Sequence, residues 1–173
     1  MKRTSAAAGL MVMAMLAFGP ELNACGDKSL SAGGIRMQRA MAARYPASIL
    51  MYAPATSRLP SATRELKLTE TLNKVGHKYR EVATLPELQA SVDTGQYNIV
   101  LADFAQLAEV QKQFESSPSR VVIVPVAYNL TKAEAKEAAK QSRYLISAPS
   151  RAAQYLATIA EAVRSGSSIP RKG

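Results

Sequence analysis

A chain of 173 residues with 47% hydrophobic residues is long enough for one globular domain with a sizeable core. Its single Cys and single His exclude an internal disulfide and a four-ligand structural zinc site, so no metal site is predicted. The net charge of +9 attracts polyanions, but the basic residues are scattered and no Trp is available for base stacking, so a nucleic-acid partner is not expected.

The N-terminus has the features of a cleaved secretory signal. Lys2 and Arg3 form a positive start, and the apolar segment 9–18 that follows is too short to cross a membrane. A Gly-Pro pair then breaks the segment, and the small residue Ala24 closes the pattern. We predict that residues 1–24 are a signal peptide and that the mature protein is exported to the periplasm or cell envelope.

Cys25 follows this predicted cleavage site directly. The segment Leu22-Asn23-Ala24-Cys25 resembles the signal of bacterial lipoproteins, in which the cysteine receives a lipid before cleavage. Two alternatives stay open. Either a lipid on Cys25 anchors the protein to a membrane, or ordinary cleavage after Ala24 leaves a free thiol.

Short apolar segments and amphipathic segments alternate from Ala47 onward. The residues before them, 25–46, are expected to form a leader or arm with a flexible break at Gly33-Gly34 and a short helix over 35–45. The next predicted elements are a strand over 47–53, a helix over 59–75 that Gly76 ends, a strand over 78–83, and a helix that Thr84 caps and that runs to about Thr94.

The second half of the chain continues this alternation. Its predicted elements are a strand over 97–102, a helix over 104–114, a strand over 121–127, a helix that Thr131 caps and that runs to about Gln141, a strand over 144–147 and a helix over 152–164. Pro125 is expected to mark the end of its strand or a bulge, because proline cannot donate to a strand ladder. Residues 165–173 are polar and are predicted to be a disordered tail.

Apolar strands separated by amphipathic helices indicate an α/β domain over residues 47–164, with a parallel sheet covered on both faces. Right-handed crossovers give a doubly wound, five-stranded parallel sheet of order 2-1-3-4-5 in a flavodoxin-like, three-layer sandwich. Ligands of such sheets bind at the carboxyl ends of the strands. Here the first strand ends at Ala53 and Pro54 and the third at Asp103.

Residues 47–164 resemble a response-regulator receiver domain. The similarity follows the strands through ILMYAP, the Gly76-His77 turn, YNIVLADF, VVIVPVA and YLISAP. The chain looks like a member of an exported, degenerate receiver-like (pseudo-receiver) family of uncharacterised function. The resemblance implies that Asp103 occupies the phospho-acceptor position.

The resemblance also implies that the groups supporting phosphorylation are replaced. Uncharged residues occupy their positions: Ala53 and Pro54 for the magnesium-binding acids, Val126 or Ala127 for the Ser or Thr, and Ser147 or Ala148 for the Lys. Phosphoryl transfer depends on positioning and on neutralisation of charge. We therefore predict that Asp103 is not phosphorylated at useful rates and instead caps the helix that follows it.

No catalytic or cofactor motif accompanies Asp103, since G-x-S-x-G, Walker A and G-x-G-x-x-G patterns are all absent from the sequence. We predict a non-catalytic interaction module, without a cofactor, that binds a protein partner by contact. Receivers signal through the face of their fourth helix, fifth strand and fifth helix. The matching candidates are Lys132, Lys136, Lys140, Arg143, Tyr144, Arg151 and Tyr155. The alternative is a residual phospho-acceptor or small-anion-binding receiver that uses Asp103.

Overall fold

The computed structural model describes residues 32–115 and 121–167. The predicted signal peptide (1–24), the lipidation candidate Cys25 and the end of the predicted tail (168–173) lie outside the described residues. Within the described ranges, no helix combines the length and the apolar character that a membrane crossing requires.

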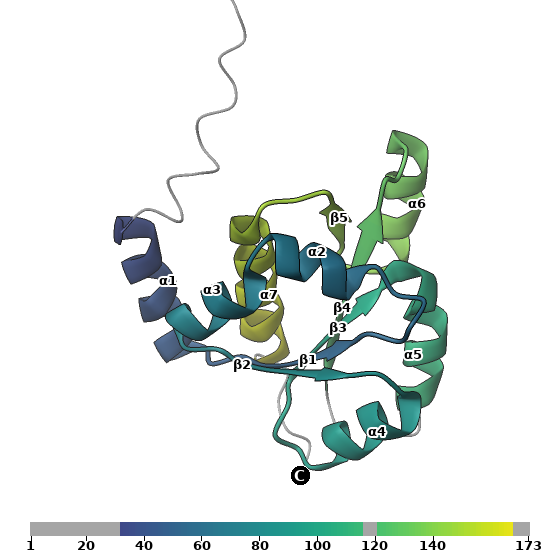
Figure 1. Cartoon of the computed structure of the whole chain (residues 1–173), viewed down its shortest axis with the longest axis horizontal. Helices are drawn as coiled ribbons and strands as arrows, with labels where there is room; N and C mark the ends of the chain where they lie inside the picture. Colours follow the sequence, from purple (N-terminus) through teal and green to yellow (C-terminus); the bar gives the residue numbers. More distant parts are fainter. Residues whose placement is uncertain (1–31, 116–120, 168–173) are drawn as a thin grey trace, which may run out of the picture.

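A five-stranded parallel sheet forms the centre of the described part of the molecule (Figure 1). The strands are β1 (Ser48–Tyr52), β2 (Lys78–Val82), β3 (Ile99–Asp103), β4 (Val122–Tyr128) and β5 (Ile146–Ala148). Their order in the sheet is β2-β1-β3-β4-β5, and every neighbouring pair is parallel. The predicted α/β fold class and strand order are therefore confirmed.

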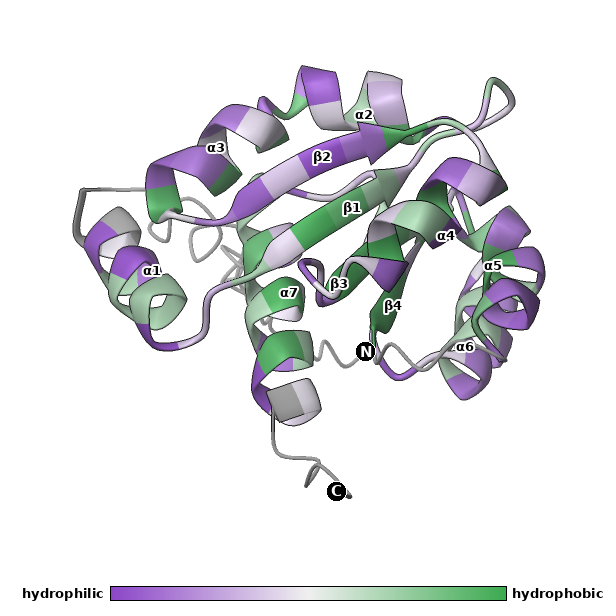
Figure 2. Ribbon diagram, turned by 90° about the horizontal axis from the view of Figure 1, so that it is seen from below, coloured by the Kyte–Doolittle hydropathy of each residue, from purple (hydrophilic) through white to green (hydrophobic). Residues whose placement is uncertain are grey.

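The pattern of burial along the strands follows their place in the sheet. Every residue of the central strand β3 is buried, as both faces of a parallel sheet are covered by helices. The edge strand β2 is mostly exposed and carries Lys78, Arg80 and Glu81 (Figure 2). Charged side chains on an edge strand oppose pairing with a further strand.

One face of the sheet is covered by α2 (Leu59–Glu65), α3 (Leu68–Val75) and α7 (Ala152–Ser167), and α1 (Ala32–Arg44) lies beside α3 (Figure 1). Ile49, Met51 and Leu101 pack there against Leu72 and Tyr155 in the larger apolar cluster. The arm helix α1 packs on α3 and α7, and the Arg39 Nε donates a hydrogen bond of 2.7 Å to the Lys74 carbonyl.

The second face is covered by α4 (Leu85–Asp93), the 3₁₀ turn η2 (Phe104–Gln106) and α5 (Leu107–Phe114), while α6 (Lys132–Gln141) lies beyond α5 (Figures 1 and 2). Leu50 and Val100 of the sheet pack against Leu88, Val92 and Val110 of the helices. In α6 only Ala138 is buried, so this helix contributes little to the core.

The helix expected over 59–75 is in fact two helices, α2 and α3, that meet at Lys67. Lys67 has a φ of 47°, in the left-handed region. At about 100° per residue, Leu59 of α2 and Leu72 of α3 would lie on nearly opposite sides of one continuous helix. The break turns both buried stripes toward the sheet, which explains a conformation that is unfavourable for a non-glycine residue.

The predicted helix boundaries at Gly76, Thr84 and Thr131 are confirmed. Gly76 ends α3 with a φ of 98°, a left-handed conformation that glycine adopts without strain. The Thr84 side chain accepts a hydrogen bond from the backbone N–H of Glu87. Thr131 and Glu134 form a complete capping box at the start of α6.

Three further expectations differ from the structure. The flexible break expected at Gly33-Gly34 is absent, since α1 runs through both residues. The strand end or bulge expected at Pro125 is absent, since β4 pairs with β3 through this residue. Proline is tolerated there because β5 pairs with β4 only from Val126 onward. The last helix also continues to Ser167 instead of ending at Arg164, and the lack of a side chain on Gly166 lets it approach Val122.

Candidate functional site

Two neighbouring hollows lie at the carboxyl ends of the strands, where ligands of doubly wound sheets bind. One hollow is next to Asp103, and we call it the Asp103 hollow. The other lies between α2 and the ends of β4 and β5, and we call it the tyrosine cavity because Tyr128 and Tyr155 line it. Arg58 and Tyr128 line both, so the two hollows are adjacent.

The Asp103 hollow has a volume of about 330 Å³ and is lined by Thr56, Arg58, Phe104 and Tyr128 in addition to Asp103. Asp103 is only 9% exposed, and each of its carboxylate oxygens accepts a main-chain hydrogen bond. Oδ1 accepts from the N–H of Ala105 at 3.3 Å, and Oδ2 accepts from the N–H of Arg58 at 3.4 Å. The carboxylate thereby caps η2 and also fixes the loop between β1 and α2.

Of the residues that the resemblance assigned to supporting positions, only Ala127 is among those that line the Asp103 hollow. Ala53 follows β1 and is buried, Pro54 comes next, and β5 ends at Ala148. Ser147 is exposed between two buried residues of β5. Across the described ranges, no group of three or more His, Cys, Asp or Glu side chains is placed to hold a metal ion.

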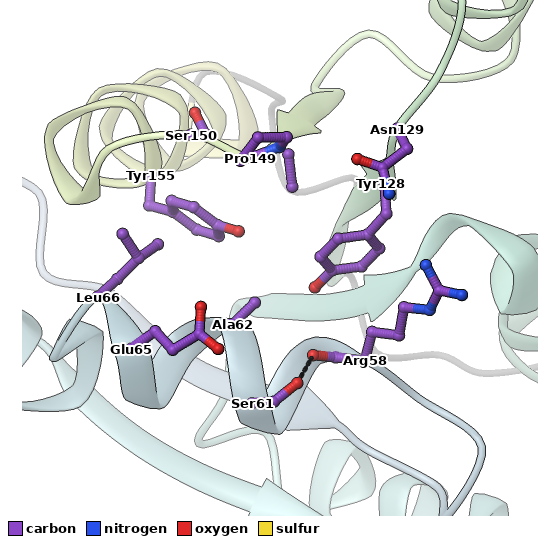
Figure 3. A pocket seen from close by; sticks show the side chains of 11 residues that line it. Arg58, Ser61, Ala62, Glu65, Leu66, Tyr128, Asn129, Pro149, Ser150 and Tyr155 are labelled. Carbon is purple, nitrogen blue, oxygen red and sulfur yellow. Dashed lines mark hydrogen bonds between the residues drawn. The ribbon is translucent and has the colours of Figure 1, made fainter.

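The tyrosine cavity has a volume of about 280 Å³. Arg58, Ser61, Ala62 and Glu65 recur at helical spacing, so α2 presents one side of itself to the cavity. The opposite wall consists of Tyr128 and Asn129 after β4, the cis Ala148–Pro149 segment, Ser150, and Tyr155 of α7 (Figure 3).

The two tyrosine hydroxyls in this cavity are buried and have no hydrogen-bond partner among the described residues. Tyr155 is 0% exposed, and Figure 3 shows both hydroxyls directed into the space between the rings and α2. Burial raises the pKa of Tyr155 to about 12. Burial, then the neighbouring Tyr155 and Asp103, raise the pKa of Tyr128 further. Both hydroxyls therefore stay protonated at neutral pH and can donate hydrogen bonds.

The predicted partner-binding residues are only partly brought together on the surface. Lys132, Lys136 and Lys140 are exposed along α6, and Lys140 pairs with Glu137 at 2.7 Å. The remaining candidates are placed differently: Arg143 and Arg151 are exposed, Tyr144 is half-buried beneath Arg143, and Tyr155 is fully buried in the core. The side chain of Tyr155 therefore lies in the tyrosine cavity and not on the exposed face.

His77 has a structural role in the turn between α3 and β2. Its ring is buried, and Nδ1 accepts a hydrogen bond of 3.2 Å from the N–H of Ala47. Burial lowers the pKa of His77, so the ring stays neutral and can keep accepting this bond.

The sequence reasoning did not identify the tyrosine cavity. Tyr128 lies one residue beyond the expected end of its strand, and Tyr155 was assigned to an exposed face. The recurrence of Arg58, Ser61, Ala62 and Glu65 at helical spacing was a signal that could have identified one wall.

Comparisons of this chain with protein-family models, with curated protein sequences and with solved structures give no match.

Proposed function

We propose that this chain is a non-enzymatic, receiver-like module of the bacterial cell envelope that binds a protein partner by contact and not by phosphotransfer. The strand order of the sheet supports the receiver-like part of the proposal. The observation that carries the rest is the pair of main-chain hydrogen bonds onto Asp103.

These hydrogen bonds give the carboxylate a role in the fold. Each oxygen of Asp103 already accepts from an N–H of a neighbouring loop or turn, so phosphorylation of either oxygen would weaken one of these hydrogen bonds. Stabilising the transferred phosphoryl group requires cations or strong donors close to it. Ala53, Pro54 and Ala148 supply neither at the ends of their strands, which leaves Arg58 as the single cation among the described residues that line the Asp103 hollow.

The exposed side of α6 is the surface that we assign to the partner. Lys132, Lys136 and Lys140 are spaced four residues apart and follow one side of the helix. Glu137 partly neutralises Lys140, so Lys132 and Lys136 carry most of the positive charge of this row. Such a row speeds association with an acidic surface and selects against a basic one. The expected partner is therefore a protein with an acidic patch.

The surface is tested by charge reversal. The double variant Lys136→Glu, Lys140→Glu should lose a partner that the wild-type protein captures from an envelope extract. The matched control is Lys74→Glu, Lys112→Glu, which changes the net charge equally on α3 and α5. Equal capture by both variants would contradict the assignment to α6.

The absence of phosphotransfer is tested separately. Wild-type protein is incubated with Mg²⁺ and a small acyl phosphate, and the intact mass is compared with that of Asp103→Asn. A phosphorylating receiver treated in parallel verifies the donor. No added phosphoryl group is expected, and a stable aspartyl phosphate at Asp103 would overturn the proposal.

The envelope location is tested on the mature protein. Mass analysis of its N-terminus distinguishes a lipid on Cys25 from a free thiol after cleavage at Ala24. A chain that still carries residues 1–24 would contradict export.

A further inference from the structure

We propose that the tyrosine cavity binds a small zwitterion of the amino-acid class. Glu65 pairs with the ammonium group of this ligand. The ligand's carboxylate accepts hydrogen bonds from the two tyrosine hydroxyls, at the side of the cavity that Arg58 lines.

The first observation that points to a ligand is the state of the two hydroxyls. Buried polar groups in proteins are nearly always hydrogen-bonded, because leaving one without a partner is unfavourable. The hydroxyls of Tyr128 and Tyr155 both lack a partner among the described residues, and both line the same cavity. Neither hydroxyl oxygen is exposed, so the walls must shift slightly on binding to admit a ligand oxygen that accepts from both donors.

The second observation is the opposite charge of two residues that line the cavity. Arg58 and Glu65 are seven residues apart, so they share one side of α2 and are separated by about 10 Å along its axis. Figure 3 shows the Glu65 carboxylate below the two rings, whereas the exposed side chain of Arg58 extends past the ring of Tyr128 and has to swing back to bring its guanidinium to the cavity. Neither forms an ion pair within the described ranges.

These charges decide between the ligand classes. A simple anion would face the carboxylate of Glu65, and a simple cation would face the guanidinium of Arg58, so each would meet a like charge. A zwitterion long enough to span the cavity pairs with both. Arg58 also offers a planar pair of donors, which suits a carboxylate.

The size and walls of the cavity limit the body of the ligand. A volume of about 280 Å³ lies just below the range of pockets for drug-sized molecules. Ala62, Leu66 and Pro149 give the walls an apolar character between the polar groups. The cavity therefore fits a compact molecule with a short apolar segment between its charges.

Binding is tested by thermal unfolding of the purified chain with a panel of single compounds. The panel contains 4-aminobutanoate, 5-aminopentanoate and 6-aminohexanoate, whose charges are separated by methylene groups, each at about 10 mM. A ligand that binds only the folded state raises Tm. For each compound that does so, we expect its methyl ester and its N-acetyl derivative to give no shift. If no member of the panel raises Tm, or if simple carboxylates raise it equally, the proposal is wrong.

Variants then place the binding site. Glu65→Gln leaves an exposed position uncharged and should weaken binding at least tenfold without affecting the fold. Tyr155→Phe removes only the hydroxyl and should also weaken binding at least tenfold. The control is Tyr79→Phe on β2, because the Tyr79 hydroxyl contacts Met51 Sδ at 3.2 Å and is remote from the cavity.

The control variant should bind the ligand as the wild-type protein does. Unchanged affinity in both Glu65→Gln and Tyr155→Phe would show that the ligand binds elsewhere. These measurements use no protein partner, so their outcome is independent of whether the α6 surface binds one.

Discussion

The Asp103 hollow and the tyrosine cavity lie side by side at one edge of the sheet and share Arg58 and Tyr128. In the first, both oxygens of the acidic side chain have their hydrogen bonds. In the second, two buried hydroxyls have no hydrogen-bond partner among the residues that the structure describes. Asp103 therefore joins two loops of the fold, while the neighbouring cavity contains two hydrogen-bond donors that our proposal assigns to a ligand.

The largest effect expected in this comparison comes from the ring of Tyr155. Tyr155→Ala should lower the free energy of unfolding by about 3–5 kcal/mol, since the fully buried ring packs in the larger apolar cluster. Urea unfolding measures the loss. A loss below about 1 kcal/mol would show that the cavity wall collapses around the missing ring and is not rigid.

The second-largest effect on stability is expected for the carboxylate of Asp103. Asp103→Ala should lower the free energy of unfolding by about 1–3 kcal/mol, as the N–H groups of Arg58 and Ala105 lose their acceptor. The same urea experiment measures it. Unchanged stability would show that the hydrogen bonds to Asp103 do not stabilise the fold. The carboxylate would then not differ from the unpartnered tyrosine hydroxyls in its contribution.

Alkaline pH tests the burial of the two tyrosine hydroxyls in the tyrosine cavity. The pKa of Tyr155 is raised to about 12 in the folded state, above its ordinary value of 10.0, so its contribution to stability is complete below pH 10 and is lost as pH rises toward 12. Each tyrosine that ionises only after unfolding adds a slope of about 1.4 kcal/mol per pH unit. The variant Tyr128→Phe, Tyr155→Phe should show a shallower decline than wild type between pH 10 and 12, measured by urea unfolding. Parallel curves would mean that the two phenols ionise freely in the folded protein.

The smallest effect is expected for the same double variant at neutral pH. Removing two hydroxyls that lack partners should leave the free energy of unfolding within about 1 kcal/mol of wild type, or raise it. Tyr79→Phe, which loses the contact with Met51 Sδ, is the matched comparison. Destabilisation of the double variant by clearly more than this amount would show that the hydroxyls are already bonded in the free protein.

The sheet could be predicted from the sequence because its signals are local. Apolar runs mark the strands, and Gly76, Thr84 and Thr131 mark helix ends through their own backbone or side-chain chemistry. The break at Lys67 was missed because no Gly or Pro marks it. The break occurs because Leu59 and Leu72 would lie on nearly opposite sides of one continuous helix. This conflict can be recognised only once both residues are known to face the same sheet.

The site was predictable only in part. Asp103 could be identified because its position depends on the strand that it ends. Tyr128 and Tyr155 come from elements that are distant in sequence, and their hydroxyls meet only after β4, α2 and α7 have packed. Whether a buried hydroxyl has a partner depends on that packing, and no local sequence pattern reports it.

The capping box of α6 has a consequence for how this protein can change. Thr131 and Glu134 secure the first turn from within the helix itself, and Ala138 is the one residue of α6 that is buried. The exposed residues of α6 can therefore be substituted, in evolution or by design, without affecting how the sheet and its other helices fold.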